Sequence, residues 1–521
     1  QMDYLAASRL GIIYADDDGI YRVEPDISPL IKDLALDAWE VTQGIQSLDH
    51  DVPLVAGKPT VVRVYGALLE GTTPAEGVAV ELRGFRGGVE LAGSPLTALN
   101  GLQSLVLGEA WDRGYTGLHD WLFRLPDSWS NSGDLHLEAS INPQTFVQES
   151  RTDNNTLVGD FHFWPSAVKC LYFVPVRTHG GIGRMDDPYF WQMVELYKQM
   201  WPISDLRLYQ SWSILAEPEW SWRTLSFRDG PFEMPGDGDL VIFHLWLGDT
   251  LSDDPDICED DGAWMQVVGM VDAYTDTGRV NGQAYLDGAQ SWVKLPSEWD
   301  HGPPYRQPWT WPRSGSTLAH ELAHNYDRKH VDCPEGVPDD VDGSYPYAPC
   351  MLDDGPPLAV TTNYGFHINT LSPITPTGTA DLMSYAASRW PSDWTYKALF
   401  AMTGPSSAAS VEATSLAVPD LANASTVVFA SGVVTETAGQ GALLPAWVHP
   451  TTSLGKSVLQ KWQALAAPER RVEAAPVPDY YIRLRDAKGV ILEDRVVSLL
   501  TSIDGVAASP AGFGIAFPAP S

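Results

Sequence analysis

Three histidines and one glutamate stand close together in this chain, at His320, Glu321, His324 and His330. Side chains four residues apart lie on one face of an α-helix, so a helix here brings His320 and His324 together. Two such imidazoles can bind one Zn²⁺ ion, and three protein ligands with a fourth position for water are typical of catalytic zinc sites. Glu321 can accept a proton from zinc-activated water. The pattern predicts zinc-dependent hydrolysis, with His320, His324 and His330 as metal ligands.

A methionine in a short turn-like run follows further along the chain, in Asp381-Leu382-Met383-Ser384-Tyr385. The long histidine motif followed by such a turn resembles the metzincin zinc metalloproteases. A tyrosine two residues after the methionine resembles the astacin and serralysin branches. Together with Tyr345-Pro346-Tyr347 and the stretch Arg389 to Trp394, these motifs resemble secreted bacterial proteases related to the mucin-cleaving zinc enzymes. The resemblance covers residues 166–405.

The resemblance implies roles for two further side chains. Tyr385 would donate a hydrogen bond to the oxyanion of a tetrahedral intermediate, or occupy the metal at rest and swing away. Met383 would form an apolar floor under the histidines. Metzincins carry glycine where this chain has Asp327, because the chain turns sharply before the third ligand. Asp tolerates left-handed backbone better than most residues, so Asp327 is expected to make this turn. Otherwise, Asp332 or Glu335 would replace His330.

The expected function is a secreted zinc endopeptidase in which Glu321 acts as general base. Resemblance to mucin-cleaving enzymes suggests glycoprotein substrates, and general extracellular protein degradation is an equal contender. A cell-surface adhesion protein with a catalytically silent zinc site is the alternative from another class. Zinc-dependent hydrolysis of a non-peptide amide is a third possibility.

Composition excludes some partners. The formal net charge is −34, so the chain lacks the basic surface that neutralises nucleic-acid phosphates or anionic lipids. No apolar run reaches the length of a membrane-spanning helix.

The chain has 4 cysteines, and this even number fits two disulfides in an oxidising, extracellular compartment. We expect the pairs Cys333–Cys350 and Cys170–Cys258, although sequence alone allows three connectivities. The start at Gln1 indicates that any signal peptide is already absent. The oligomeric state is not predicted.

The chain of 521 residues suggests two to four domains. Residues 1–35 are expected to be a lead-in segment, 36–165 an immunoglobulin-like β-sandwich and 406–521 a second β-sandwich, since short runs of alternating apolar residues dominate both flanks. Residues 166–405 are expected to form the metzincin-like catalytic domain. The expected fold class is therefore an α+β catalytic domain flanked by two all-β sandwiches.

Three stretches within the expected catalytic domain have further interpretations. The continuous apolar run 240–247 predicts a central strand, and His244 within it is interpreted as a packed residue. The acidic stretch 253–261 could bind Ca²⁺, although a solvated acidic loop is the preferred interpretation. By its order along the chain, the stretch 280–285 is expected to be an unpaired edge strand that accepts substrate.

Overall fold

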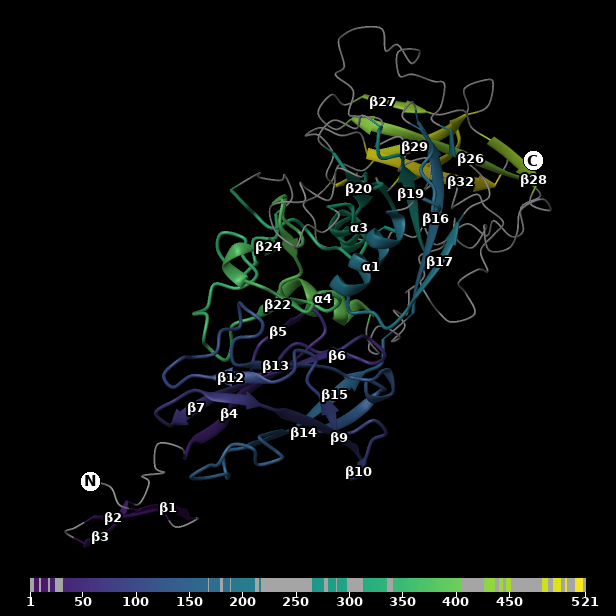
Figure 1. Ribbon diagram of the computed structural model, residues 1–521. Helices are drawn as coiled ribbons and strands as arrows, with labels where there is room; N and C mark the ends of the chain where they lie inside the picture. The colour runs from purple at the N-terminus through teal and green to yellow at the C-terminus, as the bar shows by residue number, and fades with distance from the viewer. Residues whose placement is uncertain are drawn as a thin grey trace. The chain divides into compact units, whose positions relative to one another are not determined.

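The computed structural model describes residues 31–403 apart from residues 167, 179–180, 188, 211–214, 217–264, 276–279, 287, 298–312 and 335–340. Nearer the two ends, it describes the backbone of separate strands (Figure 1). The described chain is mostly β-sheet. Its α-helices are α1 (Phe190–Met200), α3 (Arg313–His324) and α4 (Asp393–Thr403). The β-rich part of the expected fold class is therefore confirmed.

The expected lead-in segment contains three strands that the sequence did not predict. Strands β1 (Tyr4–Ser8), β2 (Gly11–Asp16) and β3 (Gly19–Val23) make an antiparallel meander. The expected boundary at residue 36 also falls inside β4 (Asp33–Thr42). The chain forms two compact units, one of residues 1–163 with 355–374 and one of residues 164–354 with 375–521.

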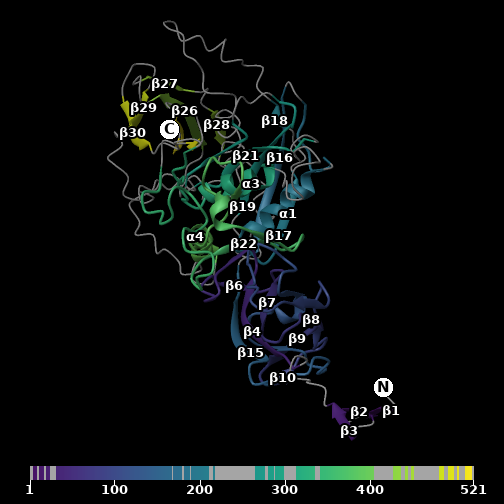
Figure 2. The same ribbon diagram turned by 60° about the vertical axis from the view of Figure 1, so that its left-hand side comes forward.

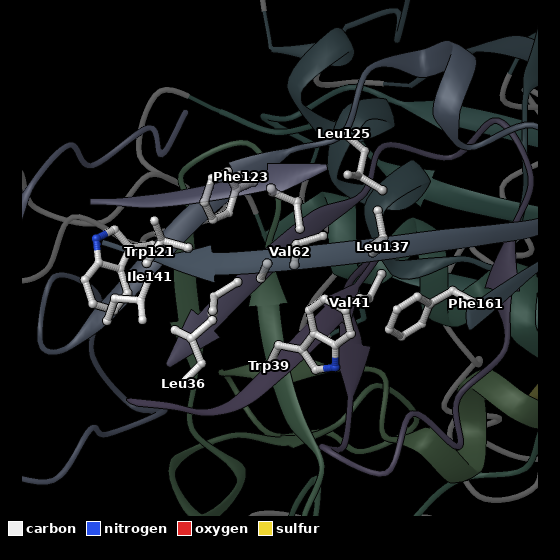
Figure 3. Packing of buried hydrophobic residues seen from close by; sticks show 14 of the residues in the cluster. Leu36, Trp39, Val41, Val62, Trp121, Phe123, Leu125, Leu137, Ile141 and Phe161 are labelled. Carbon is white, nitrogen blue, oxygen red and sulfur yellow. The ribbon is translucent and has the colours of Figure 1, made fainter. Parts of the chain in front are cut away.

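The first unit contains a β-sandwich. One sheet has the strand order β10-β9-β14-β15-β6, with β11 beside β9. A second sheet has the order β13-β7-β4, and strands β12 and β8 form a separate pair. Alternate residues of β14 are buried, as its sequence pattern predicts. Trp39, Trp121 and Phe161 lie in the shared apolar core (Figure 3). The strands are β6 (Leu54–Val55), β7 (Val61–Glu70), β8 (Ala75–Val78), β9 (Val80–Arg86), β10 (Val89–Glu90), β11 (Leu96–Thr97), β12 (Gln103–Leu105), β13 (Asp120–Arg124), β14 (Gly133–Ile141) and β15 (Thr156–Trp164).

Residues 355–374 return to this first unit although they follow the histidine motif in sequence. Strand β22 (Tyr364–His367) pairs with β5 (Ile45–Gln46) and with β23 (Ser372–Ile374). Phe366 and Ile368 are buried against Val61 and Leu122. The expected catalytic domain 166–405 is thus interrupted, because the open edge of β5 and this small apolar cluster take up the inserted segment.

The second unit contains a mainly parallel sheet. Its order is β17-β16-β19-β21-β20-β31, with β16, β17, β19 and β21 parallel and β20 antiparallel to β21. Helices α1 and α3 pack against each other, as both ribbon views show (Figures 1 and 2). The strands are β16 (Lys169–Arg177), β17 (Leu206–Gln210), β18 (Leu215–Ala216, beside β16), β19 (Met265–Val271), β20 (Gly282–Tyr285), β21 (Gln290–Lys294) and β31 (Ser502–Ile503).

The expected helix between Asp187 and Trp201 is confirmed as α1, which buries Phe190, Met193 and Met200 among others.

Beyond α4, strand β26 (Thr426–Thr435) pairs with β27 (Gln440–Leu443), β28 (Trp447–Pro450) and β32 (Ala511–Pro518). Strands β29 (Tyr480–Arg485) and β30 (Ile491–Val497) form the expected hairpin. The wider C-terminal sandwich stays a prediction. Among the described helices, none has the length and apolar character needed to cross a membrane.

Candidate metal centre

Helix α3 places two of the predicted ligands in the protein interior. Leu318, Ala319 and Leu322 are fully buried, and His320 and His324 are 2% and 0% exposed. The Trp201 Nε1–H group donates to Ala319 O at 3.1 Å, which fixes the helix against the chain that follows α1. The four-residue spacing therefore brings both imidazoles to one face of a rigidly packed helix.

The three predicted ligands converge. One ring nitrogen from each of His320, His324 and His330 lies within 4.8 Å of the others, and all three residues are buried. The Nε2 atoms of His320 and His324 are 3.0 Å apart. The ring centroid of His330 lies 4.6 Å from that of His324 and 5.3 Å from that of His320. Among the described residues, this is the one cluster of three or more potential metal ligands found.

Main-chain carbonyls orient two of these rings. His320 Nδ1 lies 2.8 Å from Leu382 O, and His324 Nδ1 lies 2.5 Å from Arg328 O. A carbonyl oxygen can only accept, so each Nδ1 carries the proton and each Nε2 presents a lone pair. Such outer hydrogen bonds are typical of metal-ligating histidines. The donor set and its orientation therefore fit a divalent transition metal, with imidazole ligands suited to zinc.

Asp327 makes the turn between the second and third histidines. Its φ is 57°, the left-handed conformation expected at this position. Arg328 N donates to Ala323 O at 3.1 Å, so the helix closes in a left-handed cap. Asp332 does not belong to the three-histidine group, and Glu335, the other replacement considered for His330, lies outside the described residues.

Glu321 is 2% exposed and lies against β20. A Cβ atom at Gly282 would be 2.6 Å from Glu321 Oε1, so any other residue there would push the carboxylate away from its present position. Asn325 joins the end of this strand to the start of β21, since its Nδ2 donates to Tyr285 O at 2.8 Å and to Gln290 O at 3.1 Å. This function of Asn325 was not anticipated from the sequence, where its only signal was its place beside His324.

The outer edge of β20 is occupied, so the prediction of an unpaired edge in the stretch 280–285 is wrong. Ala284 pairs with Ile503 and Tyr285 pairs with Ser502, in antiparallel register. Strand β31 comes from the C-terminal part of the same chain, and no local sequence pattern indicated this pairing. A peptide can add to this edge only where β31 does not already pair.

A buried carboxylate organises the methionine turn. Asp381 accepts hydrogen bonds from Met383 N at 2.7 Å, Ser392 Oγ at 2.6 Å and Thr395 Oγ1 at 3.0 Å. Burial raises the pKa of Asp381, although these hydrogen bonds oppose the rise. Met383 is itself 1% exposed. The sequence motif contained Asp381 but did not reveal that it holds the turn.

Tyr385 follows the turn with its ring beside the histidines. Its centroid lies 4.8 Å from that of His330 and 6.3 Å from that of His320. The side chain is 42% exposed, which gives its phenol access to solvent. This position is compatible with both roles considered for Tyr385, a hydrogen bond to substrate and contact with the metal.

Other sequence-based expectations have mixed outcomes. Cys333 and Cys350 form the expected disulfide. Cys170 is also disulfide-bonded, and its expected partner Cys258 lies outside the described residues, as do His244 and the whole acidic stretch 253–261 considered for Ca²⁺.

Comparisons with known proteins do not identify a family. No family model matches this chain, and no curated protein matches it. The CARDB domain of a Pyrococcus furiosus protein, solved as a crystal in complex with di-metal ions and also in solution, shares 15% and 17% identity, respectively. These matches cover 26% of this chain and 89% and 95% of that domain, with TM-scores of 0.17. A cycloisomaltooligosaccharide glucanotransferase of Paenibacillus sp. shares 10% identity over 46% of this chain and 28% of its own, also with a TM-score of 0.17. Likenesses this low carry no argument about function.

Proposed function

We propose that this protein is a secreted zinc-dependent endopeptidase with a metzincin-like catalytic part. The observation that carries the proposal is the convergence of His320, His324 and His330 beside a buried Glu321. A structural zinc site has no need of an adjacent carboxylate, whereas a hydrolase needs a base. The order of strand, helix, further strands and metal helix agrees with the arrangement that the resemblance implies.

Zinc bound at the three histidines would acidify a water molecule and polarise the scissile carbonyl. Glu321 accepts the proton of the attacking water and returns it to the leaving amine. Tyr385 supplies a hydroxyl that can donate to the developing oxyanion. The apolar surroundings of α3 hold the ligand rings in place, which limits reorganisation during the reaction.

The proposed substrates are extracellular proteins or glycoproteins. The net charge of −34 favours neutral or basic targets over sialylated mucins at low salt. The proposal includes no nucleic-acid partner and no membrane insertion. It leaves mucin-type glycoproteins and unmodified proteins as alternatives that substrate profiling separates.

Cleavage of casein and of a mucin-type glycoprotein tests the proposal directly. Glu321→Gln should lower the rate by about 10²–10⁴-fold while zinc content stays unchanged, because the general base is lost and the ligands remain. A chelator should abolish cleavage and added zinc should restore it. Glu195→Gln, on the exposed face of α1, is the matched control and should cleave like the wild type. Stoichiometric zinc in a wild type that cuts neither substrate would contradict the proposal.

A further inference from the structure

His320 differs from the other helical ligand in the origin of its orienting hydrogen bond. His324 faces the carbonyl of Arg328, four residues away, at the end of its own helix. His320 instead faces the carbonyl of Leu382, sixty-two residues further along the chain. The orientation of the first ligand therefore depends on how firmly the methionine turn is held against α3.

Arg389 links these two segments. Its Nη1 donates to Ser384 O at 3.0 Å, in the methionine turn. Its Nη2 donates to Thr317 Oγ1 at 3.2 Å and to Ser316 Oγ at 3.4 Å, on α3. Ser316 and Thr317 lie four and three residues before His320, hence on the same side of the helix. One guanidinium group thus bridges the turn and the helix face that carries the first ligand.

The same guanidinium reaches the ligand itself. Nη1 of Arg389 lies 3.4 Å from Nδ1 of His320, on the ring edge that also faces Leu382 O, and because both nitrogens carry protons this is a packing contact and not a hydrogen bond. Arginine stays protonated and presents its donors in a rigid planar fork, which lysine cannot reproduce. Because the carbonyl sets the proton on Nδ1, a shift of the turn would rotate or release the ring. Arg389 also starts β25 (Arg389–Trp390), which pairs with β24 (Ala380–Asp381) and so is anchored to the turn.

We propose that Arg389 is a positioning residue that keeps His320 oriented for metal binding by joining the methionine turn to α3. The inference rests on the proposed metal site and adds to it a residue outside the histidine motif. It requires no assumption about the substrate, because its effect is on the geometry and affinity of metal binding.

Zinc affinity measured by competition with a chromophoric chelator tests the inference. Arg389→Met should weaken zinc binding by about 10–100-fold, the usual effect of losing an outer-shell partner. Arg389→Lys keeps the charge but loses the fork, so its affinity should fall between that of the wild type and that of Arg389→Met. The visible absorption of the cobalt-substituted protein should change with Arg389→Met. Arg124→Met, which removes an arginine that donates to Ile368 O in the first unit, is the matched control with wild-type affinity.

A merely structural role would give a different result. It predicts a lower unfolding temperature in chelator with unchanged zinc affinity of the folded protein, and that result would overturn the inference. If Arg389→Met does not fold, the zinc affinity of the double variant Ser316→Ala/Thr317→Val tests the inference instead. This variant removes the two α3 hydroxyl groups that accept hydrogen bonds from Arg389 and leaves the arginine in place. Weaker zinc binding by that variant supports the inference, and wild-type affinity refutes it. If the wild-type protein binds no zinc, both the proposed metal site and the role of Arg389 are refuted. If the wild type and the Arg389→Met variant bind zinc with equal affinity, only the role of Arg389 is refuted.

Discussion

Gly282 and Glu321 approach each other so closely that a side chain at position 282 would have to displace the glutamate. A Cβ atom there would lie 2.6 Å from Oε1, 2.7 Å from Cγ and 2.8 Å from Cδ of Glu321. Strand β20 therefore limits the positions open to the carboxylate proposed as the base. Strand β20 and the side chain proposed as the general base are therefore in direct contact.

Gly282→Ala should reduce activity without loss of metal. The added methyl group displaces the Glu321 carboxylate, and a misplacement of about 1 Å can cost about 100-fold in rate. We expect kcat to fall by about 10–100-fold, with zinc content retained. Steady-state kinetics and metal analysis measure the two effects. Gly343→Ala, where no atom lies within 4 Å of the added Cβ, is the control. A wild-type kcat in Gly282→Ala would show that the contact does not constrain the base.

Asp327 offers a second prediction, because its φ of 57° is strongly disfavoured for β-branched residues. Asp327→Gly should keep the zinc affinity within about threefold, since glycine adopts this left-handed conformation freely and the turn before His330 is preserved. Asp327→Val should weaken zinc binding by at least about tenfold, because the turn that returns His330 is distorted. Isothermal titration with zinc separates the two variants, and equal affinities would show that the turn does not control the third ligand.

Local periodicity predicted some of these features, and contacts between distant segments set the others. The helix through His320 and His324 follows from four-residue spacing, and the burial of β14 follows from alternation. The functions of Arg389 and Asn325 depend on carbonyl groups of other segments, which carry no side-chain signal in sequence. The pairing of β22 with β5 joins segments more than 300 residues apart, so nothing local marks residues 355–374 as part of the first unit.

The inserted segment 355–374 depends on a buried charged group in the first unit. Arg113 donates to Thr362 O at 2.6 Å and to Gln46 O at 2.9 Å, and its guanidinium lies 4.3 Å from the centroid of the Tyr364 ring. It also pairs with Glu40 at 3.2 Å, and both side chains are fully buried. Removing Arg113 leaves Glu40 with only a longer ion pair, to Arg63 at 3.9 Å, and leaves the buried carbonyls of Thr362 and Gln46 without this donor.

Arg113→Met should therefore destabilise the first unit by about 3–5 kcal/mol. Hydrogen exchange should become faster in β5 and β22 together, because the arginine contacts both segments. Urea unfolding and amide exchange measure these changes. Arg151→Met removes an exposed pair with Asp153 and should leave the unfolding midpoint in urea close to that of the wild type, because solvent screens exposed ion pairs. Faster exchange in β5 alone would show that Arg113 does not hold the inserted segment.

The pairing of β31 with β20 leads to the last prediction, which applies once cleavage by the wild type is established. A substrate strand that adds to this part of the edge must displace Ser502 and Ile503, since both would use the same main-chain groups of β20. Ile503→Pro removes a backbone N–H and disfavours strand pairing, so it should weaken the hold of β31. We expect a several-fold higher kcat/KM for an unfolded protein substrate and little change for a short peptide that does not reach residues 284 and 285. An unchanged kcat/KM for the protein substrate would mean that the edge does not limit substrate access.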